Sequence, residues 1–295
     1  MQRRTAIKSI STATAAAFLT ENLSARVAAA DTVLHGEDFA DKVNHSACRW
    51  CYSDVQLDDL CKKGKEIGLQ AIDLLTPEEW PIARKYGLTC SMGTDQPKGY
   101  GIPNGFNRFE HHDTLVPFYE DLIKKAANAG IEKIICFSGN RGGLDDELGI
   151  QICAVGLRKL MPMAEKYKIT ICMELLNSKV DHGDYQCDTT PWGVDLVKAV
   201  GSDNFKLLYD IYHMQIMEGD VIRTIRESNK YIAHYHTGGV PGRNEIDESQ
   251  ELYYPAIMKA IVDTGYKGFV AQEFIPKNTN KLESLEKCVK ICSVG

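Results

Sequence analysis

From residue 44 onward, the hydrophobic and polar positions form two patterns that alternate along the chain. Short runs rich in β-branched and aromatic residues are typical of strands, whereas apolar residues three or four positions apart are typical of helices. The first pattern predicts eight strands: Asn44–Cys51, Ala71–Leu75, Leu88–Gly93, Lys133–Ser138, Ile169–Leu175, Phe205–Tyr212, Ile232–Thr237 and Gly268–Phe274.

The segments between these strands have helical spacing. The expected helices include residues 57–68, 115–130, 156–168, 191–201, 221–230 and 253–265, and one more, 281–292, follows the last strand. Several of them end at glycine, the residue that most easily closes a helix in the left-handed conformation. These glycines are Gly68, Gly130, Gly201 and Gly265.

Eight strand–helix units in about 250 residues match the usual size of a closed (β/α)₈ barrel. An open doubly wound sheet would favour a glycine-rich nucleotide loop after the first strand, and the sequence there is Cys48-Arg49-Trp50-Cys51. The sequence therefore predicts the α/β class, with a single TIM barrel domain over residues 31–295. The segment from Asp95 to Thr114 is rich in glycine, proline and asparagine and is expected to lie over the barrel mouth as a lid.

Residues 1–30 have the pattern of an export signal. Arg3 and Arg4 precede a stretch of small residues, and Ala28-Ala29-Ala30 offers an A-x-A cleavage site before Asp31. The arginine pair resembles a twin-arginine signal, although Ala6 stands where an aromatic residue is usual. The stretch is too short and too weakly apolar to span a membrane. We expect an exported, periplasmic protein; the alternative is an amphipathic or disordered tail.

The net charge of the chain indicates which classes of binding partner to expect. Residues 1–30 carry four positive charges and one negative, so removing them changes the net charge from −6 to −9. An acidic body without a basic stripe argues against nucleic-acid binding as the main activity. No later segment is apolar enough to enter a membrane. The expected partner is a small molecule, and the sequence leaves open whether the chain forms a homo-oligomer.

The ten cysteines carry little information about function. Cys136, Cys153 and Cys172 lie in apolar runs, where cysteine acts as a small core residue. Cys48 and Cys51 form a CxxC pair, but no second pair follows at zinc-finger spacing. We interpret Cys48 and Cys51 as strand residues, with a disulfide or redox role as the alternative.

The candidate active-site residues lie at the ends of four predicted strands. The active site of a barrel of this kind lies at the carboxyl ends of its strands. Because side chains alternate along a strand, the last inward position can be counted on each of strands five to eight. These positions are Glu174, Asp210, His236 and Glu273. Each one alone could be a helix cap or a satisfied core group.

Three carboxylates brought together in the mouth of a barrel would repel one another unless a cation were present. Three oxygen donors and one imidazole suit Mn²⁺ or Mg²⁺ better than a structural zinc site. His234 lies one layer deeper, where it is expected to fill the barrel or to bind a ligand by a hydrogen bond. His111, His112 and His182 are expected in surface loops.

Four stretches of the sequence resemble the xylose isomerase-like barrel superfamily, and within it the hydroxypyruvate isomerase-like proteins. They are "MELLN" (Met173–Asn177), "LLYDIYHMQIMEGD" (Leu207–Asp220), "AHYHTGGVPGRNEID" (Ala233–Asp247) and "AQEF" (Ala271–Phe274). The resemblance covers essentially the whole chain after the predicted signal.

This resemblance implies that Glu174, Asp210, His236 and Glu273 hold the metal. It also implies acid–base work by Glu174 and Glu273, which agrees with the chemistry, because moving a proton beside a carbonyl needs both a base and an acid. His213 and Arg243 would hold substrate oxygens, and for Arg243 the alternative is a surface ion pair. Asn177 is a weaker candidate for the pocket wall.

The implied reaction is the isomerisation of hydroxypyruvate to tartronate semialdehyde through an enediolate. Hydroxypyruvate isomerases often have glutamine at the position of His236, whereas tagatose-type epimerases have histidine. A ketose 3-epimerase or another isomerase that acts on an extracytoplasmic sugar is therefore the alternative, and a non-catalytic sugar-binding barrel is a third.

The same superfamily includes DNA-repair enzymes of the endonuclease IV type. These use three zinc ions and need an Asp-Arg-His triplet after the seventh strand. The corresponding residues here are Gly242-Arg243-Asn244, so both flanking ligands are missing. The sequence therefore argues against DNA cleavage.

Overall fold

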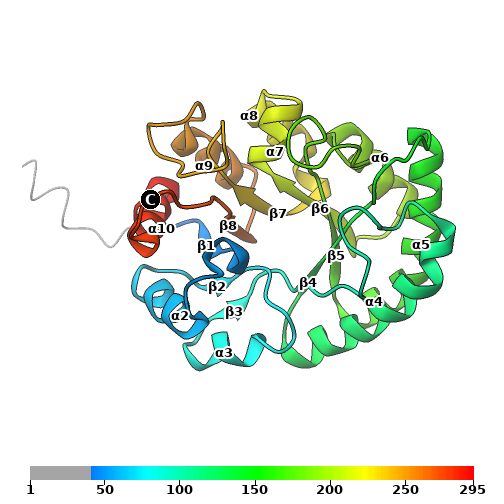
Figure 1. Ribbon diagram of the computed structural model, residues 1–295, viewed down its shortest axis with the longest axis horizontal. Coiled ribbons are helices and arrows are strands. Elements are labelled where there is room, and N and C mark those ends of the chain that lie inside the picture. Colours follow the sequence, from blue (N-terminus) through cyan, green and yellow to red (C-terminus); the bar gives the residue numbers. More distant parts are fainter. Residues whose placement is uncertain (1–40) are drawn as a thin grey trace, which may run out of the picture. The chain divides into compact units, whose positions relative to one another are not determined.

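The computed structural model describes residues 41–295, so the predicted export signal and residues 31–40 lie outside the described part. Within this part, parallel strands surround a central axis and helices enclose them (Figure 1). The strands are β1 (Asn44–Ala47), β2 (Ala71–Ile72), β3 (Thr89–Cys90), β4 (Lys133–Cys136), β5 (Thr170–Glu174), β6 (Phe205–Asp210), β7 (Ile232–Thr237) and β8 (Phe269–Gln272).

The strands close into a barrel in two stretches. Six of them pair in the order β1-β8-β7-β6-β5-β4, and β2 pairs with β3. Single parallel bridges join the two stretches, from Cys48 to Asp73 on one side and from Gly93 to Ile134 on the other. The predicted (β/α)₈ barrel is therefore confirmed, with its second and third strands reduced to two residues each.

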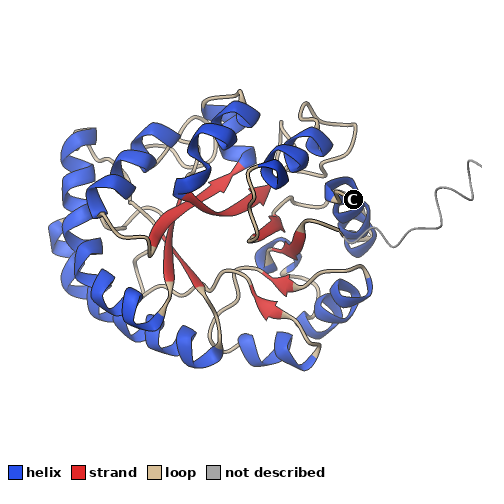
Figure 2. Ribbon diagram, turned by 180° about the vertical axis from the view of Figure 1, so that it is seen from behind, coloured by secondary structure: helices blue, strands red, loops and turns tan. Residues whose placement is uncertain are grey.

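The helices form the outer layer, as the view from behind also shows (Figure 2). They are α2 (Leu57–Glu66), α3 (Trp80–Lys85), α4 (Phe109–Ala129), α5 (Asp146–Tyr167), α6 (Thr190–Val200), α7 (Ile211–Met217), α8 (Val221–Ser228), α9 (Tyr254–Asp263) and α10 (Lys281–Cys292). Gly130 and Gly201 cap α4 and α6 in the left-handed conformation, as predicted. No helix among residues 41–295 has both the length and the apolar character to cross a bilayer.

Several predicted boundaries were wrong. The first strand stops at Ala47, and Arg49–Tyr52 form a short 3₁₀ helix, so Cys51 is not a strand residue. This turn carries the chain away from the sheet at the barrel mouth. Helix α4 begins six residues earlier than predicted, so His111 and His112 lie in a helix and His112 is buried against the core. The two short helices α3 and α7 were not predicted.

The core has two parts. A large cluster fills the space between the strands and the helices, and it includes Cys136 and Cys153. A small cluster of Met92, Ile135, Cys172 and Leu208 fills the inside of the barrel. Cys172 and Leu208 lie two residues before Glu174 and Asp210, so the alternation that was counted along strands five and six is present in the structure. All ten cysteines are buried free thiols.

Candidate active site

The structure brings the four predicted strand-end residues together. Glu174 ends β5, Asp210 ends β6, His236 lies in β7, and Glu273 directly follows β8. Asp210 and His236 are paired in the register of β6 and β7. One ligand atom from each of the four residues lies within 4.8 Å of the others, and all four side chains are buried.

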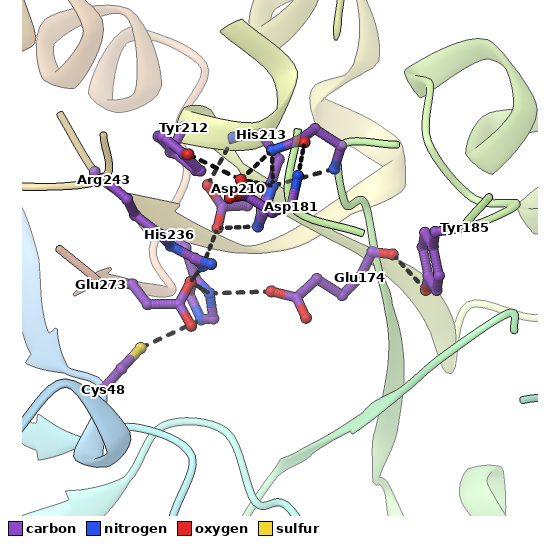
Figure 3. Close-up of polar contacts among 12 residues, drawn as sticks. Cys48, Glu174, Asp181, Tyr185, Asp210, Tyr212, His213, His236, Arg243 and Glu273 are labelled. Carbon is purple, nitrogen blue, oxygen red and sulfur yellow. Dashed lines mark hydrogen bonds and ion pairs between the residues drawn. The ribbon is translucent and has the colours of Figure 1, made fainter. Parts of the chain in front are cut away.

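His236 lies at the centre of this group (Figure 3). Its Nδ1 is 2.7 Å from Oε2 of Glu273 and 3.4 Å from Oε1 of Glu174. Its Nε2 is 2.8 Å from Oδ2 of Asp73, a buried residue that follows β2. Burial by itself would lower the pKa of His236, but Cys48, Glu273 and Asp73 outweigh burial and raise it well above its usual value.

Arg243 brings a positive charge to the carboxylates. One guanidinium nitrogen lies 2.6 Å from Glu273 and 3.0 Å from Asp210. The guanidinium carbon lies 5.1 Å from the ring centroid of Trp50 and 5.2 Å from that of Tyr212, within cation–π range of both. The side chain is only 12% exposed, so Arg243 belongs to the site and the surface ion pair that was the alternative is wrong.

The environment of Glu273 favours its ionised form. Burial would raise its pKa, but the charges of Arg243 and His236 hold it well below the usual value. Trp50 donates a hydrogen bond from Nε1 to Oε1 at 2.7 Å. Both oxygens of Glu273 therefore face donors.

Glu174 has the opposite environment. Burial raises its pKa, and the hydrogen bond with His236 opposes that shift without reversing it. Burial also raises the pKa of Asp210 despite the charge of Arg243. Asp210 has a second, local role, because Oδ1 accepts a hydrogen bond from the backbone N–H of His213 at 3.2 Å and so caps α7.

The contacts of His213 determine which ring nitrogen carries the proton. The backbone N–H of Asn177 donates to Nδ1 at 3.1 Å, and because Nδ1 accepts, the proton of the neutral ring is on Nε2. Nε2 lies 3.6 Å from Oδ2 of Asp210 and has no hydrogen-bond partner within residues 41–295. Burial and the charge of Arg243 lower the pKa of His213, so the ring stays neutral and presents an N–H donor.

A cavity of about 410 Å³ opens beside these groups. Its charged lining consists of Glu174, Arg243 and Glu273, and much of the remaining wall is apolar: Leu74, Ile102, Ile135, Phe137 and Leu176. Thr94, which directly precedes the predicted lid segment, and Ile102, which lies within it, also line the cavity. Part of the predicted lid therefore reaches the cavity.

His182 also lines this cavity, and its ring centroid lies 5.3 Å from that of His213. His182 lies in a loop, as predicted, but its half-buried side chain lines the cavity instead of lying on the outer surface. The loop after β5 folds back over the barrel mouth, where the backbone N–H of His182 donates to the carbonyl of Asn177.

The donor set fits a divalent cation. Three buried carboxylates and one imidazole nitrogen converge, and Arg243 contacts only two of the carboxylates. Oxygen-rich sites with a single imidazole suit hard or borderline divalent ions. Glu174, Asp210, His236 and Glu273 thus form a group that could hold a metal ion.

Comparison with known proteins identifies the family. The family model for xylose isomerase-like TIM barrels matches residues 65–290. The chain belongs to this family. The hydroxypyruvate isomerase of Escherichia coli (strain K12) is 31% identical over 230 residues, which are 75% of this chain and 88% of that protein. The family predicted from the four sequence motifs is thereby confirmed.

Two further similar proteins are named for activities other than hydroxypyruvate isomerisation. A D-psicose 3-epimerase from Ruminiclostridium cellulolyticum is 35% identical over 121 residues, which are 40% of this chain and 38% of that protein. A crystal structure of an AP endonuclease, family 2, from Brucella melitensis matches with a TM-score of 0.71 at 23% identity, over 85% of this chain and 97% of that one. At this identity the structural likeness shows the shared fold.

The sequence did not point to Asp73 or Trp50. Asp73 lies inside the predicted second strand, Ala71–Leu75. Identifying the last inward residue of that strand would have required knowing that the strand ends at Ile72. Trp50 lies in the CxxC segment, which was interpreted as strand. The available signal was an aromatic residue near the carboxyl end of the first predicted strand, since the carboxyl ends of all strands meet at the mouth.

Proposed function

We propose that the protein is a divalent-metal-dependent isomerase that interconverts hydroxypyruvate and tartronate semialdehyde. One observation carries the proposal: two buried glutamates line the same cavity, and their environments move their pKa values in opposite directions. Paired carboxyl groups of this kind act as acid and base. Similarity to a hydroxypyruvate isomerase over most of the chain supports the substrate.

In the proposed reaction Glu273 is the base and Glu174 is the acid. Glu273 takes a proton from C3 of hydroxypyruvate, and the electron pair of that bond forms the C2–C3 double bond of an enediolate. Glu174 then gives a proton to C2, while the hydroxyl proton moves from the oxygen on C3 to the oxygen on C2. The product is tartronate semialdehyde, and the two glutamates exchange roles in the reverse direction.

The other side chains hold and orient the substrate. Arg243 would bind a substrate oxygen with its guanidinium group, which is held between the rings of Trp50 and Tyr212. His213 would donate from Nε2, the nitrogen for which residues 41–295 offer no hydrogen-bond partner. Glu174, Asp210, His236 and Glu273 would hold Mn²⁺ or Mg²⁺, which supplies positive charge for the negative charge that develops on substrate oxygens.

The alternative is a ketose 3-epimerase that acts on an extracytoplasmic sugar. Two observations favour it: His236 stands where hydroxypyruvate isomerases often have glutamine, and the match to a D-psicose 3-epimerase reaches 35% identity over part of the chain. The two reactions need the same pair of proton-transferring groups, so they differ in the substrate and in the carbon that exchanges its hydrogen.

A substrate screen separates these functions. We expect the purified protein with Mn²⁺ or Mg²⁺ to interconvert hydroxypyruvate and tartronate semialdehyde, followed by NMR in D₂O, and to incorporate solvent deuterium. Free ketoses, D-psicose and D-fructose among them, should remain unchanged. Interconversion of these ketoses without activity on hydroxypyruvate would establish the epimerase instead. A non-catalytic binding barrel would place no deuterium in any of these compounds.

We also infer that the protein is exported through its N-terminal segment. Expressed in its host, it should be recovered from the periplasm with Asp31 near its first residue, because the A-x-A site precedes that position. Changing both Arg3 and Arg4 to Lys should leave the precursor in the cytoplasm. N-terminal sequencing of each fraction is the measurement, and a chain that starts at Met1 in every fraction contradicts export.

A further inference from the structure

A second group of polar side chains surrounds the other nitrogen of His236. Asp73 lies at its centre and is fully buried. The backbone fixes its position, since its N–H donates to the carbonyl of Ala47 at 2.8 Å and its carbonyl accepts from Arg49 at 3.0 Å. These bonds tie the second strand to the first and hold the carboxylate inside the barrel.

Four side chains approach the Asp73 carboxylate. His236 reaches it with Nε2 at 2.8 Å, and His234 reaches it with Nε2 at 3.2 Å. The hydroxyl of Ser91 donates to its other oxygen, and the thiol of Cys48 lies 3.5 Å from Oδ2. Every one of these groups can donate, and a carboxylate in such surroundings acts as an acceptor.

The contact with Asp73 determines the tautomer of His236. A neutral imidazole has one N–H and one nitrogen with a free lone pair. A bound metal ion takes the place of the proton on one ring nitrogen. Because Asp73 holds the proton on Nε2, the nitrogen with the lone pair is then Nδ1, which faces Glu273 and Glu174. Only a nitrogen with a free lone pair can bind a metal ion.

We propose that Asp73 is a positioning residue that holds His236 in the tautomer and orientation needed to bind the divalent cation. The inference rests on the proposed metal site and adds a residue that does not itself face the substrate cavity. A carboxylate behind a metal-binding histidine typically contributes about 10–100-fold to metal affinity. His234 and Ser91 hold Asp73 in place from two other sides.

Metal affinity tests this role without relying on any substrate. In Asp73→Asn the amide can turn its NH₂ toward Nε2, which favours the wrong tautomer. We expect the dissociation constant for Mn²⁺, measured from the EPR signal of the free ion, to rise about 10–100-fold. Asp188→Asn is the matched control, because it also neutralises a buried carboxylate, one paired with Arg141 and Ser178 instead of with His236. The control should bind Mn²⁺ as the wild type does.

His236→Ala separates failure of this inference from failure of the metal site. If His236→Ala weakens binding and Asp73→Asn does not, Asp73 has no positioning role. If neither variant changes the affinity, the four-residue metal site itself is wrong. Equal weakening in Asp73→Asn and Asp188→Asn would show a general loss of structure and would also overturn the proposal.

A measurement on the wild type covers the case in which Asp73→Asn does not fold. Imidazole ¹⁵N NMR of the protein with diamagnetic Mg²⁺ reports which ring nitrogen carries a proton, and the His236 signals are those that disappear in His236→Ala. We expect Nε2 to be protonated and Nδ1 not. A proton on Nδ1, with a free lone pair on Nε2, would contradict the role of Asp73.

Discussion

Replacing Glu273 with glutamine is expected to lower kcat for hydroxypyruvate by about 10²–10⁴-fold, the usual contribution of a general acid or base. Glutamine has nearly the same shape and can still accept the hydrogen bond from Trp50, but it cannot take a proton. It also removes the charge that pairs with Arg243 and His236. Glu174→Gln should reduce the rate comparably, because both proton transfers are required.

The matched control is Glu218→Gln, which changes a carboxylate that accepts hydrogen bonds from Thr190 and does not line the cavity. This variant should retain wild-type rates. In D₂O the wild type should place deuterium on the carbon that receives the proton, whereas a direct hydride shift would keep the substrate's own hydrogen. Full retention of that hydrogen, together with an active Glu273→Gln variant, would disprove the two-glutamate proton transfer.

Asp210→Ala is expected to abolish stoichiometric binding of a divalent cation while the barrel stays folded. Asp210 supplies one of the three carboxylates of the group. Without it, Arg243 keeps its ion pair with Glu273 and loses the one with Asp210. The variant also loses the cap of α7, which costs about 0.5–2 kcal/mol. In the wild type, a metal concentration of 100 times Kd should raise the free energy of unfolding by about 2.7 kcal/mol, and in Asp210→Ala this gain should disappear.

Chemical unfolding with and without Mn²⁺, together with metal analysis of the dialysed protein, measures both effects. Asp145→Ala is the matched control, because Asp145 caps α5 through the backbone N–H groups of Glu147 and Leu148, with no part in the metal group. It should lose stability by a similar amount and keep the full metal-dependent gain. Metal retained at one equivalent in both Asp210→Ala and His236→Ala would exclude the proposed ligands.

The features predicted correctly from the sequence are those that depend on residues close together in the chain. Strand alternation is local, so the inward positions of β5 and β6 could be counted, and the structure puts Cys172 and Leu208 inside the barrel below Glu174 and Asp210. Helix ends at Gly130 and Gly201 were predictable for the same reason, since glycine accepts the left-handed conformation that ends a helix.

Features that depend on loops were predicted poorly. His182 lies in an irregular segment, and no periodic pattern shows whether such a segment turns toward solvent or back over the mouth. Trp50 was assigned to the first predicted strand, Asn44–Cys51, whereas the chain turns at Arg49 into a 3₁₀ helix. In both cases the position follows from contacts with residues far away in the sequence.

The sequence by itself determined the barrel, its family and the four strand ends that face one another, because side-chain alternation and the closure of eight units follow from local backbone geometry. Only the tertiary structure decided the charges and tautomers of these groups. Arg243 is 33 residues from Asp210 and 30 from Glu273, and Asp73 is 163 residues from His236. A pKa or a tautomer depends on burial and on the charges within a few ångströms, and those neighbours come together only when the barrel closes.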